Sequence, residues 1–294
     1  MKLIKDEKYG VYFTEQGNEF DSVTFYGIVE QDEYGLGKMK NEGLQPKIVF
    51  DVGGHIGSFS YKVKMLWPDA KIVMIEPNSR SMDIAKKNLK GFDDIIFIKE
   101  GLWYGEEKPE YFMQNNWCTI GSCFNGFWLE ESYQNQKNTN YFYLEKDYDV
   151  NFCTLEDLMD RYEIEYIDLL KMDAEGIEVD FFERTKLDST NIGYMVGEWH
   201  EDHLDGSWVF PVDNSFTEHS LSWASQDLNH NQFLLKKTQT KKYNNTANSK
   251  NIEIVNERGI WITSDKNYHL VDESLAFSIK EFLKKEKCKS VVDL

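Results

Sequence analysis

The stretch Phe50-Asp51-Val52-Gly53-Gly54-His55-Ile56-Gly57 decides how the rest of the chain can fold. It follows the apolar pair Ile48-Val49 and precedes residues 58–67, whose pattern is typical of an amphipathic helix. A buried strand that ends in glycines and continues as a helix brings bare backbone N–H groups, and a carboxylate at the strand tip, against the polar end of a ligand. We therefore expect a nucleotide-like cofactor to bind here.

Strand and helix patterns alternate from residue 47 onward. The predicted strands are 47–52, 71–75, 95–98, 167–172 and 193–196. Such alternation is typical of an α/β fold in which helices cover both faces of a parallel sheet. Two further strands within 215–237, around a turn at 227–231, would close the sheet with a hairpin, and the long aromatic stretch 103–148 is expected to hold strands of its own.

The N-terminal residues 1–46 are expected to form a lid or a cover for the sheet edge. They contain two strand-like runs, 10–14 and 23–29, followed by a polar segment with several glycines. Within that segment, Tyr34 and the acidic pair Asp32-Glu33 would either line the mouth of a cofactor site or form a solvated turn.

The charge of the chain restricts its partners. The formal net charge of −18 disfavours binding to nucleic acid or to an anionic membrane, because such binding begins with Lys and Arg replacing counterions on phosphates. No apolar stretch has the length of a signal peptide or a membrane span, and the four cysteines form no CxxC pair. We expect a cytoplasmic protein with reduced thiols and no nucleic acid or membrane partner.

Carboxylates end five successive predicted strands. They are Asp51, Glu76, Glu100, Asp173 and Glu198. Ligands of open α/β sheets bind beyond the carboxyl ends of the strands, so this series favours a binding cleft over a set of unrelated helix caps.

The spacing of the glycines limits which class of cofactor can bind. Read against the dinucleotide fingerprint G-x-G-x-x-G, the first glycine position holds Val52, and the Gly-Lys-Ser/Thr of a phosphate-binding loop is absent. Glu76 follows Gly57 by nineteen residues, the spacing of an acid that binds ribose hydroxyls. A cofactor with ribose but without phosphates explains both facts, and S-adenosylmethionine is such a cofactor, because its cationic ammonium and sulfonium suit a carboxylate such as Asp51.

The residues expected to bind the cofactor come from three strand ends. Glu76 would accept both ribose hydroxyls, although an acid at a helix N-terminus is the alternative reading, and the neighbourhood of Glu100 would meet the adenine amine. The full predicted set is Asp51, Gly53, Gly54, His55, Gly57, Glu76, Asn78 and Glu100.

The sequence resembles the FkbM family of S-adenosylmethionine-dependent methyltransferases over about residues 45–235. The resemblance rests on Phe50–Gly57, on Glu76-Pro77-Asn78, on Thr154-Leu155-Glu156-Asp157-Leu158 and above all on Leu169-Leu170-Lys171-Met172-Asp173-Ala174-Glu175-Gly176-Ile177-Glu178. It implies a Rossmann-like seven-stranded sheet with a reversed final strand, and methylation of a hydroxyl, often on a sugar or a secondary metabolite. Gly54-His55 stands where the family usually has Ala-Asn.

Removal of the acceptor proton requires a base. Asp173 and His200 end neighbouring predicted strands and are the candidates, with Lys171 and Glu175 orienting them or binding the acceptor. The alternative is structural: an ion pair, a helix cap and a surface histidine. Asp173, Glu198 and His200 would also make an adequate metal set, but we predict no metal.

The expected function is therefore O-methylation of a hydroxyl on a sugar or glycan. The alternatives are a small secondary-metabolite acceptor and a non-catalytic, cofactor-binding scaffold module. The aromatic stretch 103–148 favours a polyhydroxylated acceptor, because aromatic faces stack on pyranose rings.

The C-terminal part of the chain is expected to be separate from the methyltransferase domain at 47–237. Residues 238–251 have the composition of a linker, and 252–294 read as ordered again. The ending Lys289-Ser290-Val291-Val292-Asp293-Leu294 repeats the lead-in Lys47–Val52. We expect either the truncated start of a second methyltransferase-like domain continuing beyond Leu294, or an ordinary helix and strand that dock on the main domain.

Overall fold

The computed structural model describes residues 2–115, 123–124, 144–187, 191–199, 216–218, 231–237, 261–262 and 268–269. The predicted linker, 238–251, lies outside these ranges. Of the predicted appendage, 252–294, the structure describes β15 (Trp261–Ile262) and β16 (Tyr268–His269), which form an antiparallel pair. The domain boundaries at 46, 237 and 251 therefore stay predictions. Within the described residues, no helix combines the length and the apolar character needed to cross a membrane.

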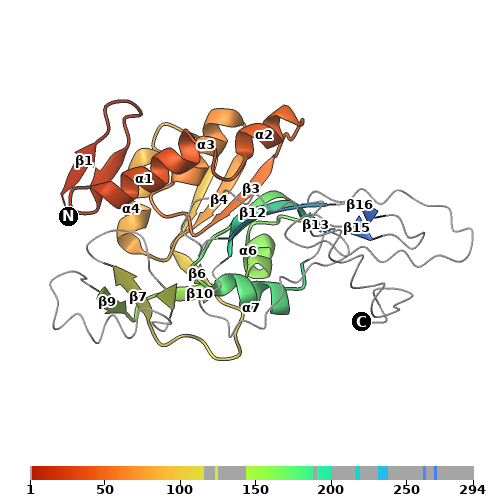
Figure 1. Cartoon of the computed structure of the whole chain (residues 1–294). Coiled ribbons are helices and arrows are strands. Elements are labelled where there is room, and N and C mark those ends of the chain that lie inside the picture. Colours follow the sequence, from red (N-terminus) through yellow and green to blue (C-terminus); the bar gives the residue numbers. More distant parts are fainter. Residues whose placement is uncertain are drawn as a thin grey trace, which may run out of the picture.

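A seven-stranded sheet forms the centre of the protein (Figure 1). Its strands are β3 (Ile48–Val52), β4 (Lys71–Ile75), β5 (Ile95–Ile98), β11 (Ile167–Met172), β12 (Ile192–Trp199), β13 (Phe216–Glu218) and β14 (Asn231–Lys237). They follow one another in the order β13-β14-β12-β11-β3-β4-β5. The five strands from β12 to β5 are parallel, while β14 runs antiparallel to both β12 and β13. The predicted Rossmann-like sheet with a reversed final strand is confirmed.

Helices cover both faces of this sheet, as expected (Figure 1). On one face lie α1 (Asn18–Val29), α2 (Leu36–Asn41), α3 (Ser58–Leu66) and α4 (Ser79–Asn88), and on the other α6 (Leu155–Arg161) and α7 (Ile177–Arg184). The helix α6 begins at a capping box, in which Thr154 Oγ1 accepts from Asp157 N–H and the Asp157 carboxylate accepts from Thr154 N–H. Satisfying both donors explains why the helix starts there.

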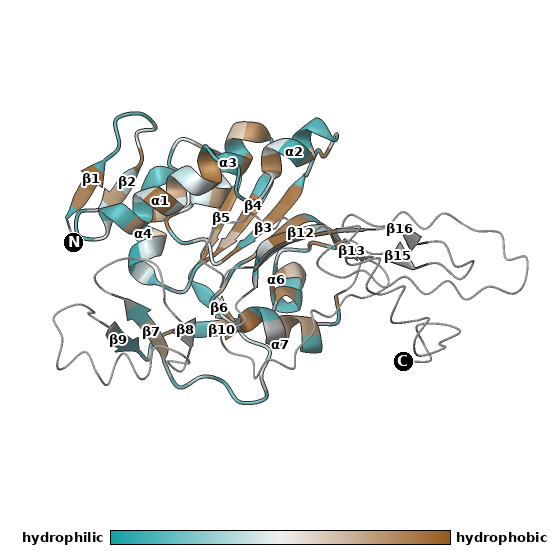
Figure 2. Ribbon diagram, viewed as in Figure 1, coloured by the Kyte–Doolittle hydropathy of each residue, from teal (hydrophilic) through white to brown (hydrophobic). Residues whose placement is uncertain are grey.

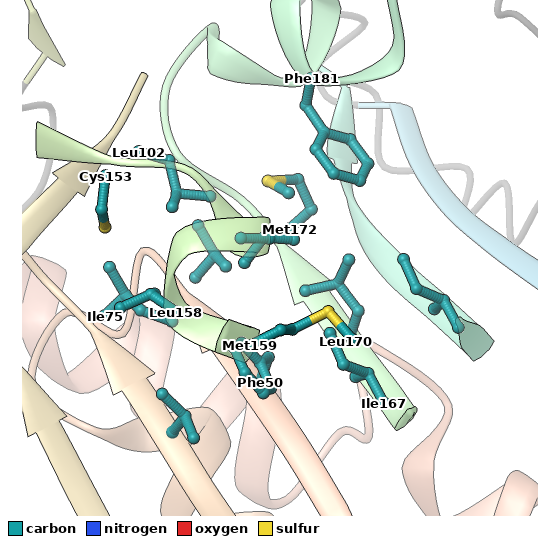
Figure 3. Packing of buried hydrophobic residues seen from close by; sticks show 14 of the residues in the cluster. Phe50, Ile75, Leu102, Cys153, Leu158, Met159, Ile167, Leu170, Met172 and Phe181 are labelled. Carbon is teal, nitrogen blue, oxygen red and sulfur yellow. The ribbon is translucent and has the colours of Figure 1, made fainter. Parts of the chain in front are cut away.

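The strand residues alternate between two buried clusters, one on each face. Phe50 of β3 packs towards α6 and α7, whereas its neighbour Val49 packs towards α2 and α3. Figure 2 shows the resulting hydrophobic colouring along the central strands, and Figure 3 shows how Leu170 and Met172 of β11 gather with Met159 and Phe181. Burying both faces in this way holds the strand ends at one rigid edge.

The N-terminal segment differs from the sequence prediction. The strands β1 (Leu3–Lys5) and β2 (Tyr12–Thr14) pair antiparallel, so part of the run 10–14 is a strand, but the run 23–29 belongs to the helix α1. The predicted second strand is wrong. Its β-branched and aromatic residues are typical of a strand, yet Phe25, Ile28 and Val29 are buried at helical spacing, and that packing decides the structure.

The aromatic stretch 103–148 contains three short strands in its described part, as expected, and two more strands flank it. The strand β6 (Glu100–Leu102) pairs parallel with β10 (Asn151–Cys153). A second, antiparallel sheet consists of β8 (Cys123–Phe124), β7 (Phe112–Asn115) and β9 (Leu144–Asp147), in that order. Glu145 of β9 lies 3.8 Å from Arg80 of α4, which brings this sheet close to that helix.

Candidate active site

The glycine loop, residues 53–57, leaves the carboxyl end of β3 and leads into α3. Gly53 has φ +71°, and a Cβ there would lie 1.7 Å from the carbonyl oxygen of Asp173 at the end of β11. Gly57 has φ +88° and caps α3 in the left-handed conformation. Glycine is required at Gly53 because the backbones of two neighbouring strand ends meet there.

The backbone N–H groups of the glycine loop are not bare, which corrects the sequence prediction. Gly53 and Gly54 both donate to the carbonyl of Ile75, at 3.1 and 3.0 Å, and Gly57 donates to Gly54. His55 N–H donates to Glu76 Oε2 at 2.8 Å. The adjacent end of β4 supplies the acceptors for Gly53, Gly54 and His55, and Gly57 donates within the loop, so the loop offers a ligand close backbone approach and neighbouring carboxylates rather than these four donors.

Glu76 stands at the end of β4 and holds two backbone segments together. Its carboxylate accepts from His55 N–H and from Asn78 N–H, each at 2.8 Å, and the residue is only 7% exposed. Burial raises the pKa of Glu76 to about 7. A carboxylate has about four acceptor positions, so two remain for further donors such as ribose hydroxyls.

Asn78 acts as the N-cap of α4. Its Oδ1 accepts from the N–H groups of Arg80 at 2.9 Å and Ser81 at 3.3 Å. The structure thus shows a structural role for this side chain, and its contact with the cofactor stays a prediction.

Lys171 lies at the centre of the strand ends. It pairs in register with Asp51 on the neighbouring parallel strand, so both side chains lie on the same face. Its Nζ donates to the carbonyl of Gly53 at 2.6 Å and lies 3.2 Å from Asp173 Oδ2 and 3.8 Å from Asp51 Oδ1. Burial opposes its charge, but the Asp173 and Asp51 carboxylates outweigh burial and raise the pKa of Lys171. The lysine is therefore a buried cation that joins β3 to β11.

One buried carboxylate oxygen of Asp51, Oδ1, is open in the sense that it accepts no hydrogen bond within the described residues, although the Lys171 ammonium lies 3.8 Å from it. The residue is fully buried, and its Oδ2 accepts from Ser60 Oγ at 2.6 Å, but among the described residues Oδ1 has no hydrogen-bond donor. The hydroxyl of Ser58, the first residue of α3, is also buried without a hydrogen-bond partner among them. Buried polar atoms are normally satisfied, so two open atoms beside the glycine loop suit a polar ligand.

Asp173 accepts a hydrogen bond from Tyr34, a residue that is not in the predicted set of site residues. Tyr34 OH donates to Asp173 Oδ2 at 2.8 Å, and this tyrosine is 4% exposed. Of the two readings of Tyr34, the solvated turn is excluded by its burial. Its ring packs edge-on against Phe59, with the centroids 5.6 Å apart.

The acidic loop, residues 173–176, follows β11. Its backbone N–H groups bind Glu178, which is not in the predicted set of site residues either. Glu178 is fully buried and accepts from Ala174 N–H at 2.7 Å and from Gly176 N–H at 2.8 Å. Glu175 and Gly176 both have positive φ, +56° and +104°. The repeated acids of the motif 171–178 are the only signal that pointed to Glu178.

The remaining predicted residues lie in distinct places. Glu100 forms a bidentate ion pair with Arg161 at 2.7 and 3.1 Å, and this pairing holds the pKa of Glu100 below its usual range. His55 lies with Nε2 3.8 Å from the buried Asp21 Oδ1, and burial lowers the pKa of this imidazole. His200 lies outside the described residues, among which no group of three His, Cys, Asp or Glu side chains could hold a metal ion.

Comparison with solved structures shows only low similarity. The chain is 12% identical to an rRNA methylase from Streptococcus thermophilus, with a TM-score of 0.39, covering 67% of this chain and 91% of that one. It is 13% identical to a precorrin-6y C5,15-methyltransferase from Geobacter metallireducens, with a TM-score of 0.33, covering 80% and 94%. These values are too low to assign an acceptor. No curated protein sequence matches the chain.

The family model of the methyltransferase FkbM domain matches residues 51–239, well over half of the chain. The match begins at Asp51 and contains the glycine loop, Glu76, Lys171 and the acidic loop. The open oxygen of Asp51, the close approach at Gly53 and the remaining acceptor positions of Glu76 fit S-adenosylmethionine, the cofactor of this family. The chain belongs to the FkbM methyltransferase family.

Proposed function

We propose that the protein transfers the methyl group of S-adenosylmethionine to a hydroxyl of a sugar or glycan. The observation that carries the proposal is the position of Asp173. Its carboxylate lies at the end of β11, 3.2 Å from Lys171, and its own backbone carbonyl lies against Gly53 of the cofactor loop. A carboxylate at that place is suited to accept the proton of a hydroxyl that attacks a methyl group bound beside the loop.

The cofactor is held by two carboxylates in this proposal. The open Oδ1 of Asp51 attracts the cationic methionine end, and Glu76 accepts the ribose hydroxyls at its two remaining positions. Gly53, Gly54, His55 and Gly57 shape the surface against which the cofactor lies, and Asn78 and Glu100 are proposed to flank its ribose and adenine. The bound cofactor supplies an electrophilic methyl group.

The protein's residues align and deprotonate the acceptor. Asp173 takes the hydroxyl proton, and the buried cation Lys171, 3.2 Å away, holds this carboxylate in place. Glu175, at the turn of the acidic loop, is proposed to orient the acceptor, and His200 is the second candidate for the base. Because the sulfonium is already reactive, alignment of the two reactants supplies much of the rate increase.

An aromatic pair at the two ends of the aromatic stretch supports a sugar acceptor. The rings of Tyr111 and Tyr148 lie 5.8 Å apart, Tyr148 is 65% exposed, and Lys146 Nζ lies 3.9 Å from the centre of the Tyr111 ring. Glu145 on β9 lies 3.8 Å from Arg80 in the first turn of α4, the helix that Asn78 caps. The exposed ring of Tyr148 is proposed to pack against the apolar face of a pyranose ring.

Calorimetry tests the cofactor half of the proposal. Wild-type protein is expected to bind S-adenosylmethionine and S-adenosylhomocysteine, and Glu76→Ala to bind both at least about tenfold more weakly, since its hydrogen bonds to two hydroxyls are lost. Undiminished binding by Glu76→Ala would remove the ribose assignment. Absence of binding by the wild type would overturn the proposal.

A panel of free sugars, oligosaccharides and small phenolic alcohols, assayed with methyl-labelled cofactor, tests the acceptor half. The sugars are expected to be methylated, and Asp173→Asn is expected to lower the rate by about 10²- to 10⁴-fold. A normal rate for Asp173→Asn and for His200→Ala would eliminate both candidate bases. Methylation of the phenolic alcohols alone would contradict the sugar assignment.

A further inference from the structure

Tyr34 lies outside the part of the chain that the FkbM domain model matches, which begins at residue 51. It is in the connection between α1 and α2, yet its hydroxyl reaches Asp173, 139 residues further along the chain. The N-terminal segment therefore contributes a side chain directly to the centre of the site.

The contact between Tyr34 and Asp173 is specific in its geometry. The hydroxyl and the Lys171 ammonium both approach the same carboxylate oxygen, Oδ2, at 2.8 and 3.2 Å. Burial, together with the Asp173 charge, raises the pKa of Tyr34 well above its ordinary value, so the phenol stays protonated and remains a donor. Two fixed donors on one oxygen define the rotation of the Asp173 carboxylate.

The segment that carries Tyr34 is itself fastened to α3. Lys62 Nζ donates to the carbonyl of Val29, at the end of α1, at 2.6 Å. Beyond α2, Trp67 Nε1 donates to the carbonyl of Leu44 at 2.9 Å. These contacts lie on either side of Tyr34, and its ring rests on Phe59 of α3 between them. The hydroxyl is therefore presented by a rigid part of the fold.

We propose that Tyr34 is a positioning residue for methyl transfer, which holds the Asp173 carboxylate in the orientation that accepts the acceptor proton. The inference rests on the proposed function, because it requires Asp173 to act as the base. It makes residues before the matched domain part of the catalytic unit rather than only a lid.

The test compares Tyr34→Phe with the control Tyr26→Phe. Tyr26 lies in α1 and also donates its hydroxyl to a carboxylate, that of Asp6, so the control removes the same kind of hydrogen bond without touching Asp173. The measurements are the calorimetric affinity for S-adenosylhomocysteine and the single-turnover rate of methyl transfer. The acceptor is the best member of the sugar panel, or concentrated glycerol as a simple hydroxyl probe.

Tyr34→Phe is expected to change the rate of methyl transfer far more than the affinity for the cofactor product. Tyr34→Phe is expected to bind S-adenosylhomocysteine within about twofold of the wild type. Its transfer rate is expected to fall by about 10- to 100-fold, because a misplaced base loses alignment, while Tyr26→Phe keeps both values. An unchanged rate in Tyr34→Phe would overturn the inference, and so would a loss of affinity as large as the loss of rate.

A crystal structure of Tyr34→Phe with S-adenosylhomocysteine tests the inference without an acceptor. The Asp173 carboxylate is expected to rotate away from its wild-type orientation. An unmoved carboxylate would contradict the positioning role even if no acceptor were methylated. Wild-type protein that binds the cofactor but methylates no hydroxyl would instead contradict the proposed function, so the two failures are distinguishable.

Discussion

The glycine loop after β3 and the acidic loop after β11 are built alike. Each leaves the carboxyl end of a parallel strand and ends at a left-handed glycine, Gly57 or Gly176, that begins a helix. A buried glutamate that accepts two backbone N–H groups holds each loop: Glu76 for the glycine loop and Glu178 for the acidic loop.

The two glutamates differ in what they connect. Glu178 belongs to α7, is fully buried, and accepts both N–H groups from the loop directly before it. Glu76 belongs to a neighbouring strand end, joins the glycine loop to its own turn, and keeps a small exposed face. A buried glutamate that closes its own loop stabilises the fold, whereas one that bridges two segments at a cleft can also bind a ligand.

The contact between the two loops gives the largest expected effect. Gly53→Ala would place a Cβ 1.7 Å from the Asp173 carbonyl, and neither backbone can move without breaking strand pairing. We expect the free energy of unfolding to fall by about 3 kcal/mol or more, and S-adenosylhomocysteine binding to be lost. Urea denaturation and calorimetry measure the two effects.

Gly43→Ala is the matched control for this substitution. Gly43 also has a positive φ, +98°, but a Cβ there would meet no atom within 4 Å among the described residues. Only backbone strain remains, about 1 to 2 kcal/mol. Equal losses in the free energy of unfolding for Gly53→Ala and Gly43→Ala would contradict a close contact between the glycine loop and the acidic loop.

Replacing each of the two glutamates by glutamine tests whether they have different roles. In Glu178→Gln one oxygen becomes an N–H donor that faces a buried backbone N–H, so we expect a loss of about 2 kcal/mol in the free energy of unfolding. The affinity for S-adenosylhomocysteine is expected to change by less than about threefold. Glu76→Gln creates the same conflict, because the two oxygens of Glu76 accept from His55 N–H and Asn78 N–H, so it is expected to lower both stability and affinity. Paired denaturation and calorimetry measure both values, and an affinity that falls in Glu178→Gln but not in Glu76→Gln would refute the division between the two glutamates.

Much of the fold could be predicted because its signals are local. The run from Ile48 to Gly57 and the repeated strand-helix alternation depend on neighbouring residues, and they led to the observed sheet. The helix at 23–29 was missed because its β-branched and aromatic residues are typical of strands, while burial of Phe25 and Ile28 is a tertiary effect.

The candidate site could be predicted only in part. Carboxylates at strand ends predict a cleft, and Asp51, Lys171 and Asp173 do lie together at the strand ends, while the cleft itself stays a prediction. Which hydrogen bonds they make depends on distant segments. Tyr34 is 139 residues from Asp173, and the N–H groups of the glycine loop are taken by the end of β4 because of strand register, for which the sequence has no local signal.

The smallest expected effect is the pH dependence that Glu76 contributes. Burial raises its pKa to about 7, while in the unfolded chain the pKa stays near the ordinary glutamate value of 4.5. Between these values the folded state holds a proton that the unfolded state has lost, so this group's contribution to stability falls as pH rises from about 5 to 7. Cofactor affinity should move the opposite way, because ribose hydroxyls donate to the ionised carboxylate.

If only the ionised form binds, the affinity of wild-type protein for S-adenosylhomocysteine is about tenfold weaker at pH 6 than at pH 8. Glu76→Gln cannot ionise and should lose this dependence, so the difference between variant and wild type isolates Glu76 from His55 and the other acids. Calorimetry from pH 6 to 8 measures the rise in affinity, and thermal denaturation from about pH 5 to 7 measures the fall in stability. Because Glu178 accepts from two N–H groups of its own loop, Glu178→Gln should leave the pH dependence of affinity intact, and a flattened profile in that variant would mean that the two loops titrate as one site.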